Sequence, residues 1–445
     1  MVSMHVAPSA TTPLRRVAGA AFAGTTIEFY DFFIYGTAAA LVFGKLFFPA
    51  LGPAAATVAA FATFGVAFFF RPLGAILFGH LGDRLGRKKT LIYTLLLMGL
   101  ATFAIGLMPT AATIGAAAPI ILVVLRAMQG LAVGGEWAGA ALLTSEFAPK
   151  GRRGLYGLWP QLGPGLAFAL SSATFLVAAL TLTPEEFLAW GWRVPFLVSI
   201  VLVGVGLYVR LKITETPVFV KALARREQSV TLPVAEALRR QWREVLLAGG
   251  TLTVVFGFFY IGTVYLIAYA GSPDIGGTLG LARPTILVGG IIAALVFAAA
   301  CATSAILSDR LGRRKVILFG NALAMVAGPL AFVIMVPGDA VSFFIGISLL
   351  LAMAGIPYGP AAAYLPEIFQ TRYRYTGAGM GYSLGGILGG ALPLLIAPPL
   401  SKAYGGIGVG FYLTVLALLS VLCALALRET KDVAMDAVLP GAAVA

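Results

Sequence analysis

The sequence predicts an all-α membrane protein with twelve transmembrane helices arranged in two related six-helix halves. Of its 445 residues, 60% are hydrophobic and 11% are charged, whereas a soluble domain carries roughly 25% charged residues. Apolar stretches of about 20 residues, long enough to cross roughly 30 Å of hydrocarbon, recur along the chain. One short motif also occurs twice, about half the chain apart, which indicates an internal duplication.

Each predicted span is an apolar stretch bounded by charged or turn-forming residues. The twelve spans lie at residues 17–42, 57–79, 90–108, 119–145, 155–179, 193–209, 245–269, 284–307, 315–336, 341–364, 377–398 and 408–427. Glycine (54 residues) and proline (25 residues) are frequent inside them. Small residues allow membrane helices to approach closely, and neighbouring helices re-satisfy the backbone at proline.

The segment 210–244 divides the chain, because six spans precede it and six follow it. It is the longest and most charged of the loops. We therefore predict an N-terminal half at 1–209, a cytoplasmic linker loop at 210–244 and a C-terminal half at 245–445. Residues 232–245 have apolar positions at helical spacing, which suits either a helix lying along the membrane surface or a solvated linker.

The formal net charge of +13 is explained by membrane topology. If the N-terminus is cytoplasmic, most of the 31 Lys and Arg residues fall in cytoplasmic segments, chiefly near 80–90, 146–154, 210–244 and 309–315. This pattern follows the positive-inside rule and places both termini in the cytoplasm. It also removes the main argument for a nucleic-acid partner.

Motifs for cofactor or metal chemistry are missing from the sequence. It has no Gly-x-x-x-x-Gly-Lys-Ser/Thr loop, which argues against an ATP-driven pump. Cys301 and Cys423 lie in predicted spans without metal or redox spacing, and His80 has no second histidine nearby. We expect no cofactor, no metal and no enzymatic activity, and a chain that acts as a monomer.

The repeated motif, Asp-Arg-Leu-Gly-Arg, occurs at 83–87 and at 309–313, each time in a short basic loop between two spans. In each half an acid at the end of a later span is followed by an arginine. The charges are Asp83, Arg84, Arg87, Glu146 and Arg153 in the first half, and Asp309, Arg310, Arg313, Glu367 and Arg374 in the second. They predict ion pairs that close the cytoplasmic side and break when the halves rock; alternatively, they only set the topology.

The first of these loops resembles the signature loop of the major facilitator superfamily, and the second departs from it at Ala305, where the leading glycine falls. Other strings resemble the metabolite:proton symporter family, which includes bacterial shikimate, α-ketoglutarate, citrate and proline/betaine porters. They are Glu-Phe-Tyr-Asp-Phe-Phe-Ile-Tyr-Gly at 28–36, Arg-Pro-Leu-Gly at 71–74, Arg-Ala-Met-Gln-Gly at 126–130, Gly-Gly-Glu-Trp at 134–137 and Gly-Trp-Arg-Val-Pro-Phe at 191–196. The resemblance covers the whole chain. It implies the major facilitator fold and a proton-coupled symporter in a bacterial inner membrane that imports a small metabolite by alternating access.

Five ionisable residues lie inside predicted spans: Glu28, Asp31, Arg71, Arg126 and Glu136. A charge at membrane depth is costly, so each is a functional candidate. We predict Asp31 as the proton acceptor and Arg126 as its switchable partner, because a carboxylate beside an arginine binds a proton weakly and a desolvated one binds it strongly. Relatives in the superfamily are similar in this pairing. Glu28 is a second proton-site candidate; the alternative is a static ion pair between spans.

Arg71 is the candidate ligand of a substrate carboxylate, since a guanidinium suits bidentate carboxylate recognition; it can equally neutralise Glu28. Glu136 is expected to be structural or to act in gating. Uncharged polar and aromatic side chains predicted to line a substrate cavity between the halves are Tyr30, Tyr35, Gln129, Trp159, Gln161, Tyr260, Tyr265, Tyr358 and Tyr382. Each of these is individually also compatible with a packing role.

Two functions besides the import of an organic acid stay open. Gly163-Pro164-Gly165 resembles part of the signature of proton-coupled drug or metabolite exporters, although Trp159 stands where that signature has glycine. A zwitterion such as betaine or proline is the other alternative, because the acids Glu28 and Glu136 leave room for a positive group.

Overall fold

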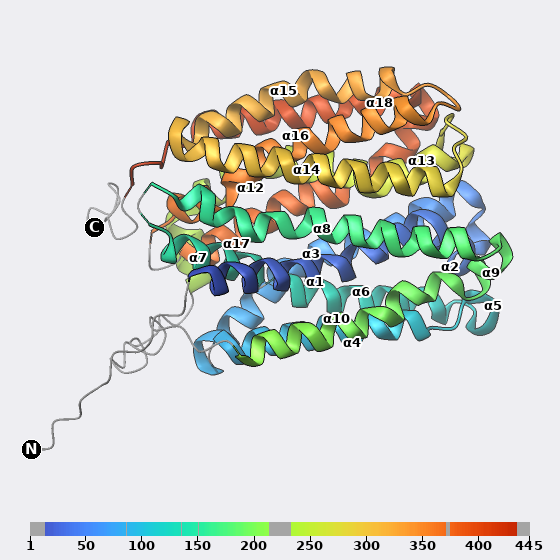
Figure 1. The fold of residues 1–445 in the computed structure, drawn as a ribbon, viewed down its shortest axis with the longest axis horizontal. Coiled ribbons are helices and arrows are strands. Elements are labelled where there is room, and N and C mark those ends of the chain that lie inside the picture. Colours follow the sequence, from blue (N-terminus) through green and yellow to red (C-terminus); the bar gives the residue numbers. More distant parts are fainter. Residues whose placement is uncertain are drawn as a thin grey trace, which may run out of the picture.

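The structure, a computed structural model, describes residues 14–85, 87–134, 136–149, 151–212, 233–370 and 374–433. Throughout these ranges the chain is helical, with short connections. The helices run side by side along one direction and form two bundles, the first from α1 to α10 and the second from α12 to α18 (Figure 1). The membrane class and the two-half arrangement predicted from the sequence are therefore confirmed.

The first half contains the helices up to α10. They are α1 (Leu14–Ala38) with a π-helical turn (Ala39–Phe43) and α2 (Gly44–Phe47), α3 (Pro53–Leu85), α4 (Arg87–Leu107), α5 (Ala111–Ile114), α6 (Ala117–Gly134), α7 (Glu136–Phe147), α8 (Arg153–Thr181), α9 (Pro184–Ala189) and α10 (Val194–Lys212). Helices α6 and α7 together form the fourth crossing.

The second half repeats this plan. It contains α12 (Pro233–Tyr260) with a π-helical turn (Ile261–Tyr265) and α13 (Leu266–Gly271), α14 (Arg283–Leu311), α15 (Arg313–Ile334), α16 (Ala340–Ile368), α17 (Arg374–Gly386) with a π-helical turn (Ile387–Ala391), and α18 (Leu392–Ala426). The first crossing of each half thus carries a π-helical turn near its second end.

Eleven helical stretches of the described chain are long and apolar enough to cross a membrane. The last of them, Arg374–Ala426, has 53 residues, which at about 1.5 Å per residue far exceeds the thickness of a bilayer. Gly405 interrupts it with a φ of 70°. The chain reverses there, because Gly381 before the break and Ser420 after it both lie beside the same part of α12. This stretch makes two crossings, which gives the twelve that were predicted.

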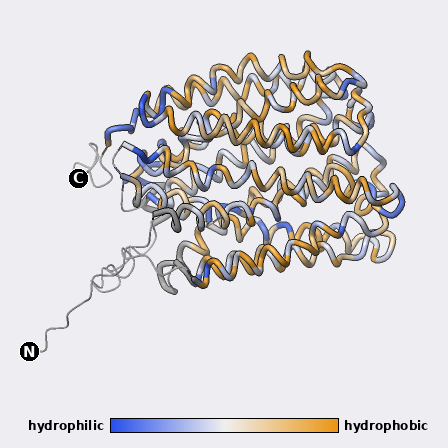
Figure 2. The backbone as a smooth tube through the Cα atoms, in the orientation of Figure 1, coloured by the Kyte–Doolittle hydropathy of each residue, from blue (hydrophilic) through white to orange (hydrophobic). Residues whose placement is uncertain are grey.

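The start of α1 and the end of α18 lie at one end of the bundle, which we call the terminus end; the opposite end is the far end (Figure 1). Figure 2 shows apolar residues along the lengths of the helices and hydrophilic ones gathered at the two ends. This distribution is that of a protein whose sides face lipid and whose ends face water.

Helix boundaries differ from the predicted linker at both of its ends. Helix α10 continues to Lys212, so Arg210 belongs to a span and is buried. Helix α12 begins at Pro233 and bends at Gln241, where φ is −132° and ψ is 33°. The helical spacing at 232–245 therefore reflects a helix over 233–240 that bends into the seventh crossing.

The two halves meet along α8, α14 and α16 on one side and along α3, α17 and α18 on the other. Small residues allow this close approach. A Cβ atom on Gly154 of α8 would run into the backbone and side chains of Ala305 and Ser308 on α14. Gly157 lies against Ala362 of α16 in the same way. The seam is thus built from glycine and alanine, as is typical of helix contacts in membranes.

Glycines also set the distance between α3 and α6 inside the first half, and so place Arg71. A Cβ on Gly130 would overlap the backbone of Ala67 on α3, whereas a Cβ on Gly204, on the outer face of α10, would have no neighbour within 4 Å. We expect Gly130→Ala to lower the free energy of unfolding by about 1–3 kcal/mol through overpacking. Gly204→Ala, the matched control, is expected to be neutral or to stabilise by up to about 1 kcal/mol through helix propensity.

The measurement is the thermal unfolding midpoint of the purified variants in detergent, followed by intrinsic fluorescence. Equal midpoints for the two variants would contradict the close packing of α3 against α6.

Candidate functional site

Arg71 is the most unusual side chain in the membrane-spanning region. It lies on α3 immediately before Pro72, and only 1% of its surface is exposed. Its guanidinium is sandwiched between the rings of Phe32 and Phe68, at 4.6 and 4.5 Å from their centres. None of its three nitrogens has a well-aligned hydrogen-bond partner among the described residues, and the Tyr260 hydroxyl lies within hydrogen-bonding reach of the guanidinium. Cation–π contacts of about 2 kcal/mol or more therefore hold a cation whose donors are largely unused.

A small cavity of about 20 Å³ lies between the two halves. Its walls are largely aromatic: Phe29, Pro164, Val255, Phe256, Phe259, Tyr260, Phe297, Tyr358 and Tyr382. Tyr260 and Tyr382 both sense the charge of Arg71, so the guanidinium lies beside this wall. The volume suffices for about one water molecule, so the site is collapsed in this conformation.

Three of the predicted lining residues, Tyr260, Tyr358 and Tyr382, face this cavity, whereas others do not. Trp159 is 40% exposed on the outside of α8, where its ring contacts Phe22, so its prediction as a cavity residue is wrong. The side chains of Tyr30, Tyr35 and Tyr265 are buried elsewhere: the first bonds to Thr174 on α8, the second to Thr63 on α3, and the third lies in a π-helical turn nearer the far end. The apolar lining residues were missed because nothing in the sequence separates a cavity phenylalanine from one that faces lipid or the core.

A layer of contacts closes the seam on one side of this cavity. The indole of Trp137 stacks on the ring of Tyr382, with centres 3.8 Å apart. Gln161 accepts a hydrogen bond from Trp137 Nε1 (2.9 Å) and donates one to the carbonyl of Tyr358 (2.7 Å). The hydroxyls of Tyr358 and Tyr382 lie 3.2 Å apart. Trp137 and Gln161 belong to the first half and the tyrosines to the second, so this layer links the halves.

Asp31 and Arg126 are both buried and form no ion pair in the described structure, so the static ion pair that was the alternative interpretation is not formed in this conformation. The Asp31 carboxylate lies within hydrogen-bonding reach of the hydroxyls of Thr102 and Ser199, while its Oδ1 has no partner. Arg126 donates to Gln129 Oε1 (2.9 Å) and lies over the rings of three aromatic residues, namely Phe32, Tyr35 and Phe64. Each group is held by other partners, which keeps the two charges apart.

Arg210 adds a buried charge that sequence reasoning missed. It forms an ion pair with Glu136 and donates to the carbonyl of Leu91. Gly24 of α1 lies beside this pair. Glu28, one turn further along α1, senses the charges of Arg210 and Arg71, and its Oε1 has no partner. Glu136 thus forms an ion pair, whereas Glu28 is a buried acid for which the described residues show no ion pair.

Charged groups of the second half close the seam at the terminus end. The Asp309 carboxylate accepts hydrogen bonds from the backbone amides of Gly154 and Leu155, both at 2.9 Å. These amides form the first turn of α8 in the other half, where free N–H groups and the helix dipole favour an anion. Arg313 holds the same carboxylate at 2.7 Å.

Glu367 is the second link between the halves at this end. It pairs with Arg153 of the first half at 3.1 Å and lies 3.6 Å from Arg313. It also accepts a hydrogen bond from the Thr430 hydroxyl at 2.6 Å. One buried carboxylate therefore connects the start of α8, the start of α15 and the segment after α18.

The other predicted gate residues are placed less uniformly. The side chain of Arg310 is exposed, and only its carbonyl takes part, by accepting a bond from Lys431. Arg374 is buried at the start of α17 and donates to the carbonyl of Phe369. The side chains of Asp83, Arg84, Arg87 and Glu146 lie outside the described part of the structure.

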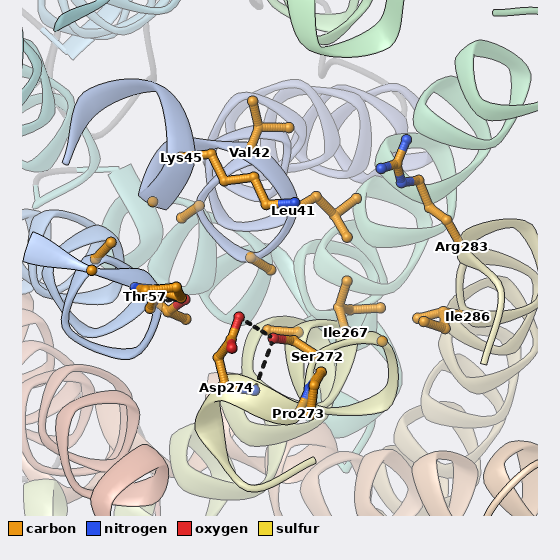
Figure 3. Close-up of a pocket in the computed structure, with 18 of the residues that line it drawn as sticks. Leu41, Val42, Lys45, Thr57, Ile267, Ser272, Pro273, Asp274, Arg283 and Ile286 are labelled. Atoms are coloured by element: carbon orange, nitrogen blue, oxygen red, sulfur yellow. Dashed lines mark hydrogen bonds between the residues drawn. The ribbon is translucent and has the colours of Figure 1, made fainter. Parts of the chain in front are cut away.

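The far end of the seam holds a cavity of about 760 Å³. Figure 3 shows Leu41, Val42, Lys45 and Thr57 from the first half facing Ile267, Ser272, Asp274 and Ile286 from the second. Its volume is that of a pocket for a small molecule. The halves thus leave a cavity between them at the far end and are linked by charged groups at the terminus end.

This architecture, with two six-helix halves and buried charges at their interface, defines a membrane transporter of the major facilitator type, not an enzyme. Residues 17–438 match the family described as sugar (and other) transporter, and the chain belongs to that family.

Similar proteins agree with this assignment. The chain is 42% identical over 417 residues to the inner membrane metabolite transport protein YhjE of Escherichia coli K12, covering 94% of both chains. It is 39% identical over 428 residues to the shikimate transporter of the same organism, covering 94% of this chain and 95% of the other. The structure of the E. coli proton:xylose symporter XylE matches with a TM-score of 0.74 at 17% identity, over 95% of this chain and 98% of the other. The predicted membership of the major facilitator superfamily and its fold are confirmed.

The links made by Glu367 generate a prediction about the terminus end. Glu367→Gln removes the charge that holds Arg153 and Arg313, so we expect the seam to open more often. Ala362→Cys, placed at the seam in a background with Cys301→Ser and Cys423→Ser, reports this through its rate of maleimide labelling. The expected rise in rate is about fivefold, the effect of roughly 1 kcal/mol on a two-state equilibrium.

Asp339→Asn is the matched control. Asp339 lies outside the spans and caps the far-end start of α16, where hydrogen bonds from the amides of Ser342 and Val341 hold the pKa of its carboxyl below the usual range. Asparagine caps a helix as well as aspartate does, so labelling at position 362 is expected to stay at the parent rate. A control that opened the seam as much as Glu367→Gln would contradict the link.

Proposed function

We propose that this protein is a proton-coupled symporter that imports a small organic acid across a bacterial inner membrane, acting as a monomer with both termini in the cytoplasm. The observation that carries the proposal is Arg71, a buried cation beside the cavity between the halves whose three nitrogens lack well-aligned hydrogen-bond partners among the described residues. An unpaired charge at membrane depth costs at least about 2.5–3.5 kcal/mol. A substrate carboxylate supplies the missing acceptor through a bidentate contact.

Recognition of the rest of the substrate falls to the aromatic wall of the cavity. The hydroxyls of Tyr260, Tyr358 and Tyr382 can bond to polar substituents, and the phenylalanine rings cover an apolar body. Arg71 is the cation beside this wall, which favours a molecule with one carboxylate over a di- or tricarboxylate. Shikimate-like ring acids meet these requirements.

Proton coupling is assigned to the buried acids of α1. Asp31 and Glu28 each have an oxygen without a partner, and a desolvated carboxyl favours its neutral, protonated form. Arg126 is the cation that becomes available to Asp31 when the proton leaves. Loading from the far end and release at the terminus end would drive import.

Alternating access supplies the cycle. With the positive-inside orientation, the 760 Å³ cavity faces the periplasm and the Asp309 and Glu367 links close the cytoplasmic side. Substrate would enter from the far end, occupy the site of Arg71 and leave when these links and the Trp137–Tyr382 stack separate.

A zwitterion with a quaternary ammonium group is the second candidate substrate. Seven of the nine residues lining the central cavity are aromatic, and aromatic cages bind quaternary ammonium ions through cation–π contacts. Arg71 would then hold the carboxylate of a betaine.

Uptake into proteoliposomes tests the proposal. We expect one member of a radiolabelled panel (shikimate, α-ketoglutarate, citrate, benzoate, proline and betaine) to accumulate only with an inward proton gradient. Asp31→Asn is expected to abolish accumulation while substrate exchange continues, because exchange needs no net proton movement. Full accumulation in Asp31→Asn would reject Asp31 as the coupling site, and proton-driven loss of a preloaded compound would favour the exporter.

The role of Arg71 is tested by keeping its charge and removing its planar fork. Arg71→Lys is expected to raise KM for the accumulated acid by about tenfold or more, since one charge-assisted hydrogen bond contributes about 1.5–3 kcal/mol. The matched control is Arg239→Lys on the exposed surface of α12, which should leave KM unchanged. A normal KM with reduced turnover in Arg71→Lys would show that Arg71 does not bind the substrate.

A further inference from the structure

Asp31 and Arg126 are the two ends of a chain of four buried side chains, with Thr102 and Gln129 between them. Arg126 Nη1 donates to Gln129 Oε1 (2.9 Å), and Gln129 Nε2 donates to the Thr102 hydroxyl (2.8 Å). The Thr102 hydroxyl lies within hydrogen-bonding reach of the Asp31 carboxylate and donates to the carbonyl of Met98 (2.9 Å). All four side chains are at most 1% exposed, so water does not compete for these bonds.

We propose that Thr102 and Gln129 are positioning residues for proton coupling, which relay the protonation state of Asp31 to Arg126. The chain Asp31–Thr102–Gln129–Arg126 is called the relay below. It joins α1, α4 and α6, three separate crossings of the first half. The proposal rests on the proposed function in one respect, namely that Asp31 exchanges the proton.

The direction of each hydrogen bond makes the relay sensitive to a proton. A guanidinium only donates, so Gln129 must turn its carbonyl towards Arg126 and its amide towards Thr102. Thr102 has one hydroxyl proton and two acceptor sites. When Asp31 carries a proton, it donates to Thr102, which then keeps its bond to Met98. When Asp31 is ionised, the Thr102 hydroxyl must donate its hydrogen bond to the carboxylate instead of to the Met98 carbonyl.

Arg126 responds because its bond to Gln129 competes with an ionised Asp31 for the same guanidinium. Its Nη2 has no hydrogen-bond partner among the described residues, and its Nε donates only weakly, at 3.4 Å, to the carbonyl of Phe64. Gln129 is therefore the side chain that holds Arg126 on the aromatic rings in the proton-loaded state. Breaking this bond frees Arg126 for Asp31, which moves α6 relative to α1.

Other charged groups around Asp31 are separate from the relay. They are Glu28 on α1, Arg71 on α3, Glu136 on α7 and Arg210 on α10. The neighbouring helices also carry hydroxyl groups, namely Thr102 on α4, Thr174 on α8 and Ser199 on α10. Of these charges, Glu28 acts directly on Asp31. Ser199 also reaches Asp31, but it bonds back to Phe196 of its own helix and leads to no cation.

The test is a pH titration of purified protein in nanodiscs, followed by infrared difference spectroscopy. The C=O band of protonated Asp31 is identified by its loss in Asp31→Asn, so the readout needs neither substrate nor transport. Thr102→Val and Gln129→Leu each remove a link at nearly constant volume. Thr102→Ser restores the hydroxyl. Thr94→Val is the matched control, because within the described part of the chain the Thr94 hydroxyl on the same helix bonds only to the Leu91 carbonyl.

We expect Thr102→Val and Gln129→Leu to shift the Asp31 midpoint by about one pH unit or more, a tenfold change in proton affinity. Thr102→Ser and Thr94→Val should titrate like the parent protein. The double variant Thr102→Val/Gln129→Leu should shift by less than the sum of the single shifts, because both residues belong to one chain.

Parent-like titration of Thr102→Val and Gln129→Leu would overturn the relay and leave Asp31 as the proton site of the proposed function. Strictly additive shifts would also overturn it, since they would mean two independent effects on Asp31. If no titrating band disappears in Asp31→Asn, the proton site itself is wrong and the relay fails with it.

Discussion

Desolvation of charged side chains is the constraint on which the rest of this structure depends. In hydrocarbon a charge must find a partner, be neutralised or be compensated by a ligand. Arg210 and Glu136 satisfy this requirement by pairing, whereas among the described residues Arg71 is held chiefly by aromatic rings. In the proposed mechanism a proton neutralises the acids of α1 and the substrate carboxylate pairs with Arg71. Neither the acids nor Arg71 therefore need a permanent partner within the protein.

Charged groups at the contact between the halves also find partners when they are buried. The Asp309 carboxylate of the second half accepts hydrogen bonds from the free amides at the start of α8, a helix of the first half. Glycine and alanine on α8, α14 and α16 let the backbones approach closely enough for this contact to form. A seam of a few polar links between smooth surfaces can separate without unfolding either half, which is what rocking of two rigid bundles requires.

Sequence reasoning found the charges but not all of their partners. Asp31, Arg126, Glu28 and Arg71 were recognised because a charge in an apolar stretch is visible without a structure. Arg210 was missed because helix boundaries from sequence are uncertain by a few residues, and a single residue decides between loop and span here. Trp159 was misplaced because helical rotation relative to the neighbours cannot be read from a helix that is apolar on all sides.

Hydropathy, charge asymmetry and the internal repeat determined by themselves that this chain crosses the membrane twelve times in two related halves. These properties depend on composition and spacing along the chain, because apolar stretches of sufficient length partition into lipid and positive loops stay in the cytoplasm. The tertiary structure alone decided that Asp31 meets Thr102 and not Arg126, that Arg71 lies unpaired beside an aromatic wall, and that Asp309 caps a helix of the other half. Such contacts depend on how the helices are rotated and packed, because residues distant in sequence become neighbours only when the glycines and alanines of the interfaces set the distances between helices.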